Sequence, residues 1–169
     1  AEELGETLSK TYPANQSNEA YAPDAESAGR RSLKNIALAY LSKLPDTESL
    51  DLVRHQYYGA DNMTDIVGAL GLLINLDVPE REKALDDYFN RFRRDPLVVE
   101  KWLSLQAMST LPGTLETVKS LMEHEAFSIR NPNKVRALIG AFVMGNPTGF
   151  HAADGSGYGF LGDRVIELD

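Results

Sequence analysis

The chain has 169 residues and no cysteine, and its 17 Lys and Arg residues against 25 Asp and Glu residues give a net charge of −8. This acidic balance argues against a general nucleic-acid binder and against a polybasic membrane-surface module, because both need a basic surface. The absence of cysteine excludes disulfides, thiolate metal sites and cysteine nucleophiles.

The sequence shows no segment that would place the chain in a membrane or export it. No stretch approaches the ~20 apolar residues of a membrane span, and no signal peptide is visible. We therefore predict a cytoplasmic protein that binds neither nucleic acid nor membrane. The chain begins at Ala1 without an initiator methionine and ends at Asp169 inside a helical pattern, which predicts a segment of a longer polypeptide.

Helical patterns begin close to the N-terminus. Ala1 to Thr11 is expected to form a short helix, and Tyr12 to Pro23 a polar loop. Asp24 is the expected N-cap of the next helix. Apolar residues three and four positions apart predict the buried face of that helix. These residues are Ala28, Leu33, Ile36, Ala37, Tyr40 and Leu41.

Local start and stop signals mark the helices that follow. Pro45-Asp46-Thr47 ends one helix and begins the next, which Gly59 ends. The segment that opens at Asn62 is apolar almost all round, a pattern that predicts burial on several sides. After a glycine-rich loop, Tyr158 to Leu168 forms a last amphipathic segment.

The spacing of these signals predicts a repeat architecture. Helix starts fall near residues 47, 63, 79, 96, 114 and 132, about 17 residues per helix and about 35 per antiparallel pair. No segment alternates with the period of two that a strand requires. We predict an all-α fold, a curved array of antiparallel helix pairs like a HEAT or armadillo α-solenoid, with about eight or nine helices in a single domain over residues 1–169.

The three histidines form no recognisable metal site. His124 and Glu125 begin the zinc-peptidase motif H-E-x-x-H, but Ser128 stands where the second histidine is needed. A single remaining imidazole cannot hold the metal, so we interpret His124 as a surface or helix-end residue. His55 is interpreted as structural and His151 as a loop residue.

Other motifs are also better explained by structure than by catalysis. Gly155 to Gly159 follows no strand and lacks the Lys-Ser/Thr pair of a phosphate loop, so we interpret it as a turn. Ser156 lacks the strand-turn-helix context of a nucleophile elbow. The acidic residues are interpreted as solvated helix faces and Trp102 as core. We predict no catalytic or metal-binding residue in this chain.

A basic cluster at a helix start has two interpretations. Asn131 or Asn133 can cap a helix whose first turns carry Lys134 and Arg136. Positive side chains are unfavourable there because the helix dipole prefers anions at its start. The cluster is therefore either ordinary surface charge or a site that receives a carboxylate.

Several blocks of the sequence are similar to one known family. Together, and in this order, they resemble the C-terminal helical domain of the alanyl aminopeptidase (aminopeptidase N) family, in its bacterial and plant branch. The blocks are Arg30–Asn35, Asn62–Asp65, Asp95–Trp102, Leu115–Val118, Asn131–Phe142 and Phe150–Tyr158.

The resemblance implies a segment of a zinc metallopeptidase that removes N-terminal residues from peptides. In that family an earlier domain carries H-E-x-x-H and the motif G-x-M-E-N, and neither motif occurs here. The chain is therefore expected to bind no zinc, which belongs to the parent enzyme, and to be inactive alone. The implied partners are the upstream catalytic domain of the same polypeptide and peptide substrates.

The resemblance also implies the role of the basic cluster. The family's last domain closes over the active site and lines an internal peptide chamber, and the matching block makes Arg136 the expected chamber residue, with Asn133 and Lys134 as further candidates. Helices expected beyond Asp169 would cover the stripe from Tyr158 to Leu168, which is predicted to be partly exposed without them. The alternative function is a free-standing helical-repeat scaffold that binds a protein partner.

Overall fold

In the computed structural model, the described residues are 4–17, 19–44 and 47–168, and all their regular structure is helical. The prediction of an all-α fold is therefore confirmed. The chain divides into two compact units, Ala1–Leu73 and Ile74–Asp169, so the single domain over residues 1–169 stays a prediction. Among the described residues no helix has the length and apolar character that crossing a bilayer requires.

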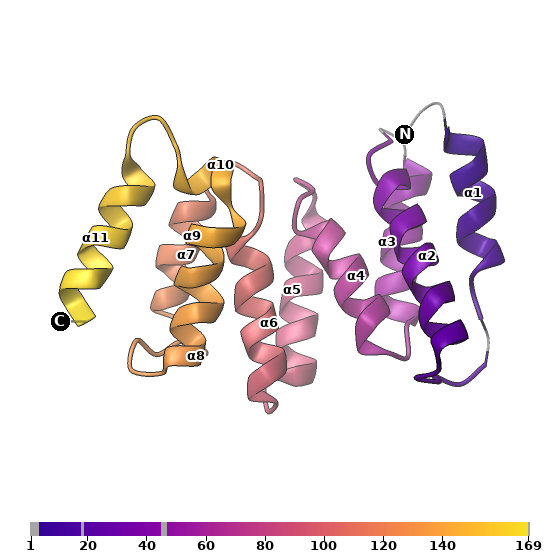
Figure 1. The fold of residues 1–169 in the computed structure, drawn as a ribbon, viewed down its shortest axis with the longest axis horizontal. Helices are drawn as coiled ribbons and strands as arrows, with labels where there is room; N and C mark the ends of the chain where they lie inside the picture. The colour runs from indigo at the N-terminus through magenta and orange to yellow at the C-terminus, as the bar shows by residue number, and fades with distance from the viewer. Residues whose placement is uncertain (1–3, 18, 45–46, 169) are drawn as a thin grey trace. The chain divides into compact units, whose positions relative to one another are not determined.

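Unit 1 contains four helices that pack pairwise, α1 on α2, α2 on α3 and α4, and α3 on α4 (Figure 1). Their interior is filled by side chains spaced three and four apart, as burial of one helical face requires. The helices are α1 (Gly5–Ala14), α2 (Ala25–Leu41), α3 (Thr47–Gly59) and α4 (Met63–Leu73). Buried apolar residues of unit 1 are Tyr12, Ala37, Leu38, Leu41, Val53, Tyr57, Ile66, Ala69, Leu70 and Leu73.

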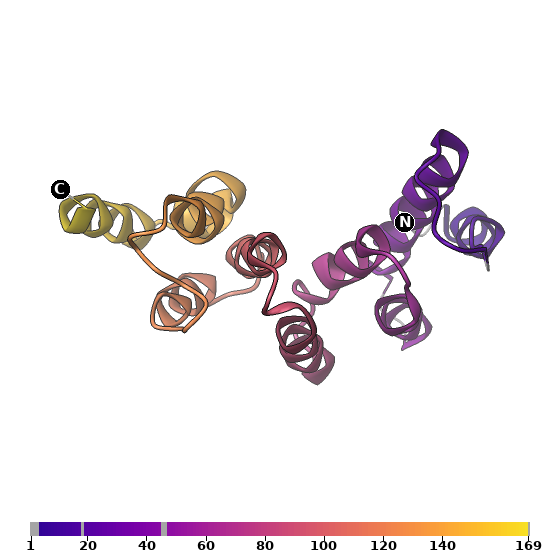
Figure 2. The same cartoon turned by 90° about the horizontal axis from the view of Figure 1, so that it is seen from below.

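Unit 2 is built around α6, which contacts α5, α7 and the helical run that begins at residue 132. In Figure 2 the helices of this unit from α5 to α7 are seen close to end-on, as roughly aligned rods. The elements are α5 (Pro79–Phe92), α6 (Pro96–Ala107), α7 (Thr114–Met122), α8 (Pro132–Val135), the π-helical turn η2 (Arg136–Gly140), α9 (Ala141–Gly145), α10 (Pro147–Phe150) and α11 (Ser156–Leu168).

The expected helix starts near 47, 63, 79, 96, 114 and 132 are confirmed, because α3 to α8 begin at these positions. The cap at Asp24 is also confirmed, since its Oδ1 accepts a hydrogen bond from the Ser27 amide at 2.9 Å. This bond lowers the pKa of Asp24. The stop signal at Pro45 and Asp46 and the first residues of the chain, 1–3, lie outside the described residues.

Two local predictions in unit 1 are wrong. The first helix continues to Ala14, because Tyr12 is buried in the core and holds the last turn despite Pro13. In α2 the buried residues are Ala37, Leu38 and Leu41, while four residues of the predicted stripe are exposed. Helical periodicity allowed either of two overlapping faces, and packing against α1, α3 and α4 selected one of them. The exposed residues are Ala28, Leu33, Ile36 and Tyr40.

In unit 2 the buried side-chain amide of Asn146 binds carbonyl groups at the end of α6. The Asn146 side chain is 2% exposed. Its Nδ2 donates to the carbonyl oxygens of Ala107 at 3.2 Å and Ser109 at 2.7 Å, and its Oδ1 accepts from the Gly149 amide at 2.9 Å. One side chain therefore caps α10 and donates to two carbonyl groups at the end of α6, of which that of Ser109 also accepts from Thr114 Oγ1 at 3.0 Å.

Replacement of Asn146 by alanine should lower the free energy of unfolding by about 2–4 kcal/mol, because it removes a cap and takes a donor from the buried carbonyl groups of Ala107 and Ser109, of which Ser109 alone keeps a second donor, Thr114 Oγ1. Chemical denaturation followed by fluorescence of Trp102, the only tryptophan of the chain, measures this loss within unit 2. The matched control is Thr148→Ala in the same short helix, where the side chain is exposed and the expected change is within about 0.5 kcal/mol. Equal effects of the two substitutions would contradict the structural role of Asn146.

A buried tyrosine should make the fold sensitive to alkali. Burial, with a smaller contribution from the charge of Asp95, raises the pKa of Tyr88 to about 12 from its usual value of 10.0. Above pH 10 the unfolded chain releases this proton before the folded chain does, so Tyr88 lowers stability as the pH rises from about 10 to about 12. Stability curves measured by urea denaturation should therefore fall less steeply in this range for Tyr88→Phe than for the wild type, and identical slopes would contradict the prediction.

Candidate functional site

The basic turn before η2 is capped by Asn131. Its Oδ1 accepts hydrogen bonds from the amides of Asn133 at 3.0 Å and Lys134 at 3.4 Å, and Pro132 occupies the first helical position. Of the two asparagines that could cap, the structure selects the one before the proline. The amides at this helix start are therefore already used, and an anion would have to be recognised by side chains instead.

Two of the three predicted binding residues lie in direct contact. The exposed Arg136 guanidinium donates through Nη1 to Asn133 Oδ1 at 3.2 Å. Lys134 is half-buried on the same turn. Within the described part of the chain neither Arg136 nor Lys134 forms an ion pair with a carboxylate. The guanidinium therefore keeps donors available for a carboxylate ligand, which arginine can bind in a bidentate way.

The backbone below Arg136 is held firmly. Arg136 begins the π-helical turn η2, whose residues Ala137, Leu138 and Ile139 are buried. Ser104 Oγ of α6 lies 2.8 Å from the carbonyl oxygen of Ala137. Turns of this kind interrupt α-helices at a cost and often occur at functional sites. The turn gives Arg136 a fixed base from which its side chain reaches solvent.

His124 and His151 lie against aromatic rings, whereas His55, predicted to be structural, is exposed on α3. His124 follows α7, packs against the rings of Phe89 and Trp102 at centroid distances of 4.9 and 5.2 Å, and accepts the Ala126 amide at Nδ1. His151 Nδ1 lies 2.6 Å from the Tyr158 hydroxyl. Within the described ranges no three His, Asp or Glu side chains come together as metal ligands, so these residues do not fit a zinc site.

The prediction of a turn over Gly155 to Gly159 is confirmed only at Gly155, because Ser156 to Gly159 form the first turn of α11. Gly155 has a φ of +74°, which favours glycine. A Cβ at Gly157 would lie 2.2 Å from the Phe150 carbonyl oxygen, so this position needs glycine for the close approach of two backbone segments. Trp102 is core, with Nε1 donating to the Leu85 carbonyl at 3.0 Å.

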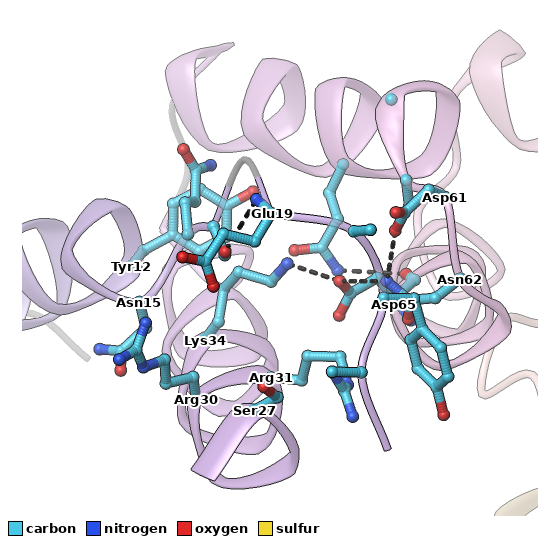
Figure 3. A pocket seen from close by; sticks show the side chains of 18 of the residues that line it. Tyr12, Asn15, Glu19, Ser27, Arg30, Arg31, Lys34, Asp61, Asn62 and Asp65 are labelled. Carbon is cyan, nitrogen blue, oxygen red and sulfur yellow. Dashed lines mark hydrogen bonds and ion pairs between the residues drawn. The ribbon is translucent and has the colours of Figure 1, made fainter. Parts of the chain in front are cut away.

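Unit 1 holds a polar pocket that the sequence did not reveal. Its volume is about 370 Å³, and residues of α1 to α4 line it. Lys34 of α2 reaches toward Asp65 of α4 in Figure 3, and the two form an ion pair of 2.6 Å. The Lys34 side chain is 12% exposed and that of Asp65 only 4%.

Amide side chains complete the environment of the buried carboxylate. Asn35 Nδ2 donates to Asp65 Oδ1 at 2.8 Å, and Asn62 Nδ2 donates to Asp65 Oδ2 at 3.0 Å. Gln56 Nε2 of α3 donates to Asn35 Oδ1 at 2.6 Å. Tyr12 lies close enough that its pKa is raised by burial and, to a smaller extent, by the charge of Asp65. The network thus joins α2, α3 and α4, and Lys34, Gln56 and Asp65 are part of the pocket lining.

One sequence signal pointed to this network. The segment from Asp65 to Leu76 contains one charged residue, Asp65, and apart from Asn75 no other polar side chain. An Asp residue is almost never buried unless it is paired. The partner could not be identified from the sequence, because Lys34 lies 31 positions earlier.

Comparisons with known proteins cover the whole chain. A family model described as "Domain of unknown function (DUF3458_C) ARM repeats" matches residues 1–169. The chain is 39% identical to aminopeptidase N of Escherichia coli (strain K12) over 170 residues, which cover 100% of the chain and 19% of that protein. It is 37% identical to aminopeptidase N of Caulobacter vibrioides over 166 residues, which cover 98% of the chain and 19% of that protein.

A solved structure shows the same fold. The crystal structure of Legionella pneumophila aminopeptidase A in complex with aspartic acid superposes with a TM-score of 0.89 and 33% sequence identity, over 99% of this chain and 21% of that one. The chain thus spans 19% of the length of the curated relatives it matches.

The Lys34–Asp65 pair should show strong energetic coupling. Asp65→Ala leaves a buried ammonium without its carboxylate, and we expect a loss of about 3–5 kcal/mol in the free energy of unfolding. The double variant Lys34→Met with Asp65→Leu removes both charges and should be less destabilised than Asp65→Ala alone. Urea denaturation followed by circular dichroism measures both. A double variant that is destabilised at least as much as Asp65→Ala would contradict the coupling.

Proposed function

The chain belongs to the DUF3458_C ARM-repeat family and is homologous to the C-terminal part of aminopeptidase N, a peptidase, and from this premise we propose that it is a non-catalytic helical segment of a zinc-dependent, cytoplasmic aminopeptidase. In this proposal the catalytic part of the same polypeptide is its partner. The helical segment covers the active site and lines the chamber that holds the peptide substrate.

The observation that carries this proposal is the free guanidinium of Arg136. It stands on the buried turn η2, contacts Asn133, and has no carboxylate partner among the described residues. A peptide whose N-terminal residue is to be removed presents a carboxylate at its other end. Arg136 would bind that group, with Asn133 orienting the guanidinium and Lys134 adding positive charge.

The residues of this chain also support the proposal that another part of the polypeptide carries out catalysis. The described part of this chain brings together no set of side chains that fits zinc, so the proposed metal and the bond-breaking chemistry belong to another part of the polypeptide. Similarity to peptidases over the full length of the chain favours this function over the free-standing scaffold. The segment would act on substrate access and orientation.

The test is Arg136→Ala in the full-length enzyme. For free peptides with a terminal carboxylate, kcat/KM should fall about tenfold or more through a higher KM, because a charged hydrogen bond is lost. The same enzyme should hydrolyse alanine p-nitroanilide unchanged, since that substrate has no carboxylate. Rates on peptides of increasing length would show whether the effect depends on how far the carboxylate lies from the N-terminus.

Two variants control this experiment. Arg136→Lys keeps the charge but not the bidentate geometry and should recover part of the loss. Arg130→Ala removes an exposed cation just before the capped turn and should leave both substrates unaffected. Equal losses on the peptide and the nitroanilide, or no loss on either, would contradict the proposed role of Arg136.

A further inference from the structure

The pocket of unit 1 has walls of opposite chemistry. Its α2 wall carries three cations, Arg30, Arg31 and Lys34, and the wall formed by α3 and the start of α4 carries acceptors, including Gln56 and Asp61. Figure 3 shows the arginines and Lys34 on one side and Asp61, Asn62 and Asp65 on the other. Positive groups on one wall and acceptors on the opposite wall match a ligand that bears both charges.

On the basic wall Arg31 is the cation without an acidic partner in the described part of the chain. Arg30 pairs with Glu26 at 2.5 Å, and Lys34 pairs with Asp65. The half-buried Arg31 instead lies over the ring of Tyr21, with its Cζ 4.7 Å from the ring centroid. This stacking restricts the guanidinium without using its hydrogen-bond donors, which stay available for a carboxylate.

On the opposite wall an acceptor lacks its donor. Gln56 is 5% exposed, and its buried Oε1 has no hydrogen-bond partner in the described structure. Nε2 donates to Asn35 Oδ1 and to the Asp65 carbonyl at 3.1 Å, so rotating the amide would place Oε1 against two acceptors. The orientation is therefore fixed. Buried acceptors without a donor are rare in native proteins, and Gln56 is one of the residues that line the pocket.

We propose that this pocket binds a small zwitterion with one carboxylate and one ammonium group, the chemistry of a free α-amino acid. The carboxylate binds Arg31, and the ammonium group donates to the exposed carboxylate of Asp61 on the opposite wall. Asp61 keeps capacity for a donor, since Asn62 Nδ2 occupies only one of its oxygens, at 3.0 Å. The volume of about 370 Å³ accommodates such a molecule with its water. This proposal rests on unit 1 alone and is independent of the function proposed above.

The experiment titrates the isotope-labelled 169-residue chain with L-alanine and follows amide chemical shifts. Saturable shifts are expected in α2 and around the start of α4. Propionate, which lacks the ammonium group, and ethylamine, which lacks the carboxylate, should each bind about tenfold more weakly or worse, since each forfeits one charged interaction. L-alanine that shifts no amide of these segments up to its solubility limit, or propionate that binds as tightly as L-alanine, would overturn the proposal.

Two variants locate the two halves of the ligand. Arg31→Gln removes the cation, and Asp61→Asn removes the anion while keeping an oxygen for Asn62; each should weaken L-alanine binding about tenfold. Asp61 is exposed, so its variant keeps the fold even if Arg31→Gln loses it. Arg94→Gln, an exposed cation of unit 2, is the control and should bind as the wild type does. Unchanged affinity in Asp61→Asn, or equal weakening in Arg94→Gln, would also overturn the proposal.

Discussion

Unit 1 depends on compensating one buried negative charge. The Asp65 carboxylate is almost fully removed from water, and a buried carboxylate is tolerated only when charges and hydrogen bonds replace its hydration. Lys34 and Asn35 of α2 supply part of this compensation, and Asn62 at the start of α4 supplies the rest. Because these groups must converge on two oxygen atoms, the position of α2 against α4 is closely constrained.

The hydrogen bonds to Asp65 also position residues that line the pocket of unit 1. Asn35 approaches α4 closely because residue 68 is glycine, where a Cβ would lie 2.8 Å from Asn35 Oδ1. Asn35 in turn holds Gln56, whose side-chain carbonyl oxygen is buried without a donor in the described structure. Gln56 Oε1 thus lacks a donor because the Gln56 amide is oriented by Asn35, which itself donates to Asp65. Arg31, one turn before Asn35 on α2, has no acidic partner among the described residues.

In unit 2 several buried carbonyl groups accept hydrogen bonds from neutral Asn and Ser side chains. Asn146 and Ser109 close the carbonyl groups around the end of α6, with Ser109 Oγ donating to the Ile74 carbonyl at 2.7 Å. Ser104 contacts the π-helical turn in the same manner. None of these hydrogen bonds involves Arg136, which is exposed to solvent at the start of the buried turn η2. The two proposed sites therefore differ in kind: Arg136 offers donors alone to a peptide carboxylate, whereas the pocket offers donors and acceptors together.

The sequence by itself determined where helices begin, because those signals are local. Asn131 before Pro132 caps a helix through amides two and three residues away, and Pro79 and Pro96 occupy first turns for the same short-range reason. The Asn133 and Arg136 contact is also local, since residues three apart share a helix face.

Only the tertiary structure decided which face of α2 is buried, that Tyr12 extends α1, and that Lys34 meets Asp65. Apolar residues on α2 were compatible with two faces, and neighbouring helices made the choice. The ion pair joins residues 31 positions apart, so no periodicity within one helix could reveal it. The pocket, lined by residues of α1 to α4, exists only because helices distant in sequence pack together.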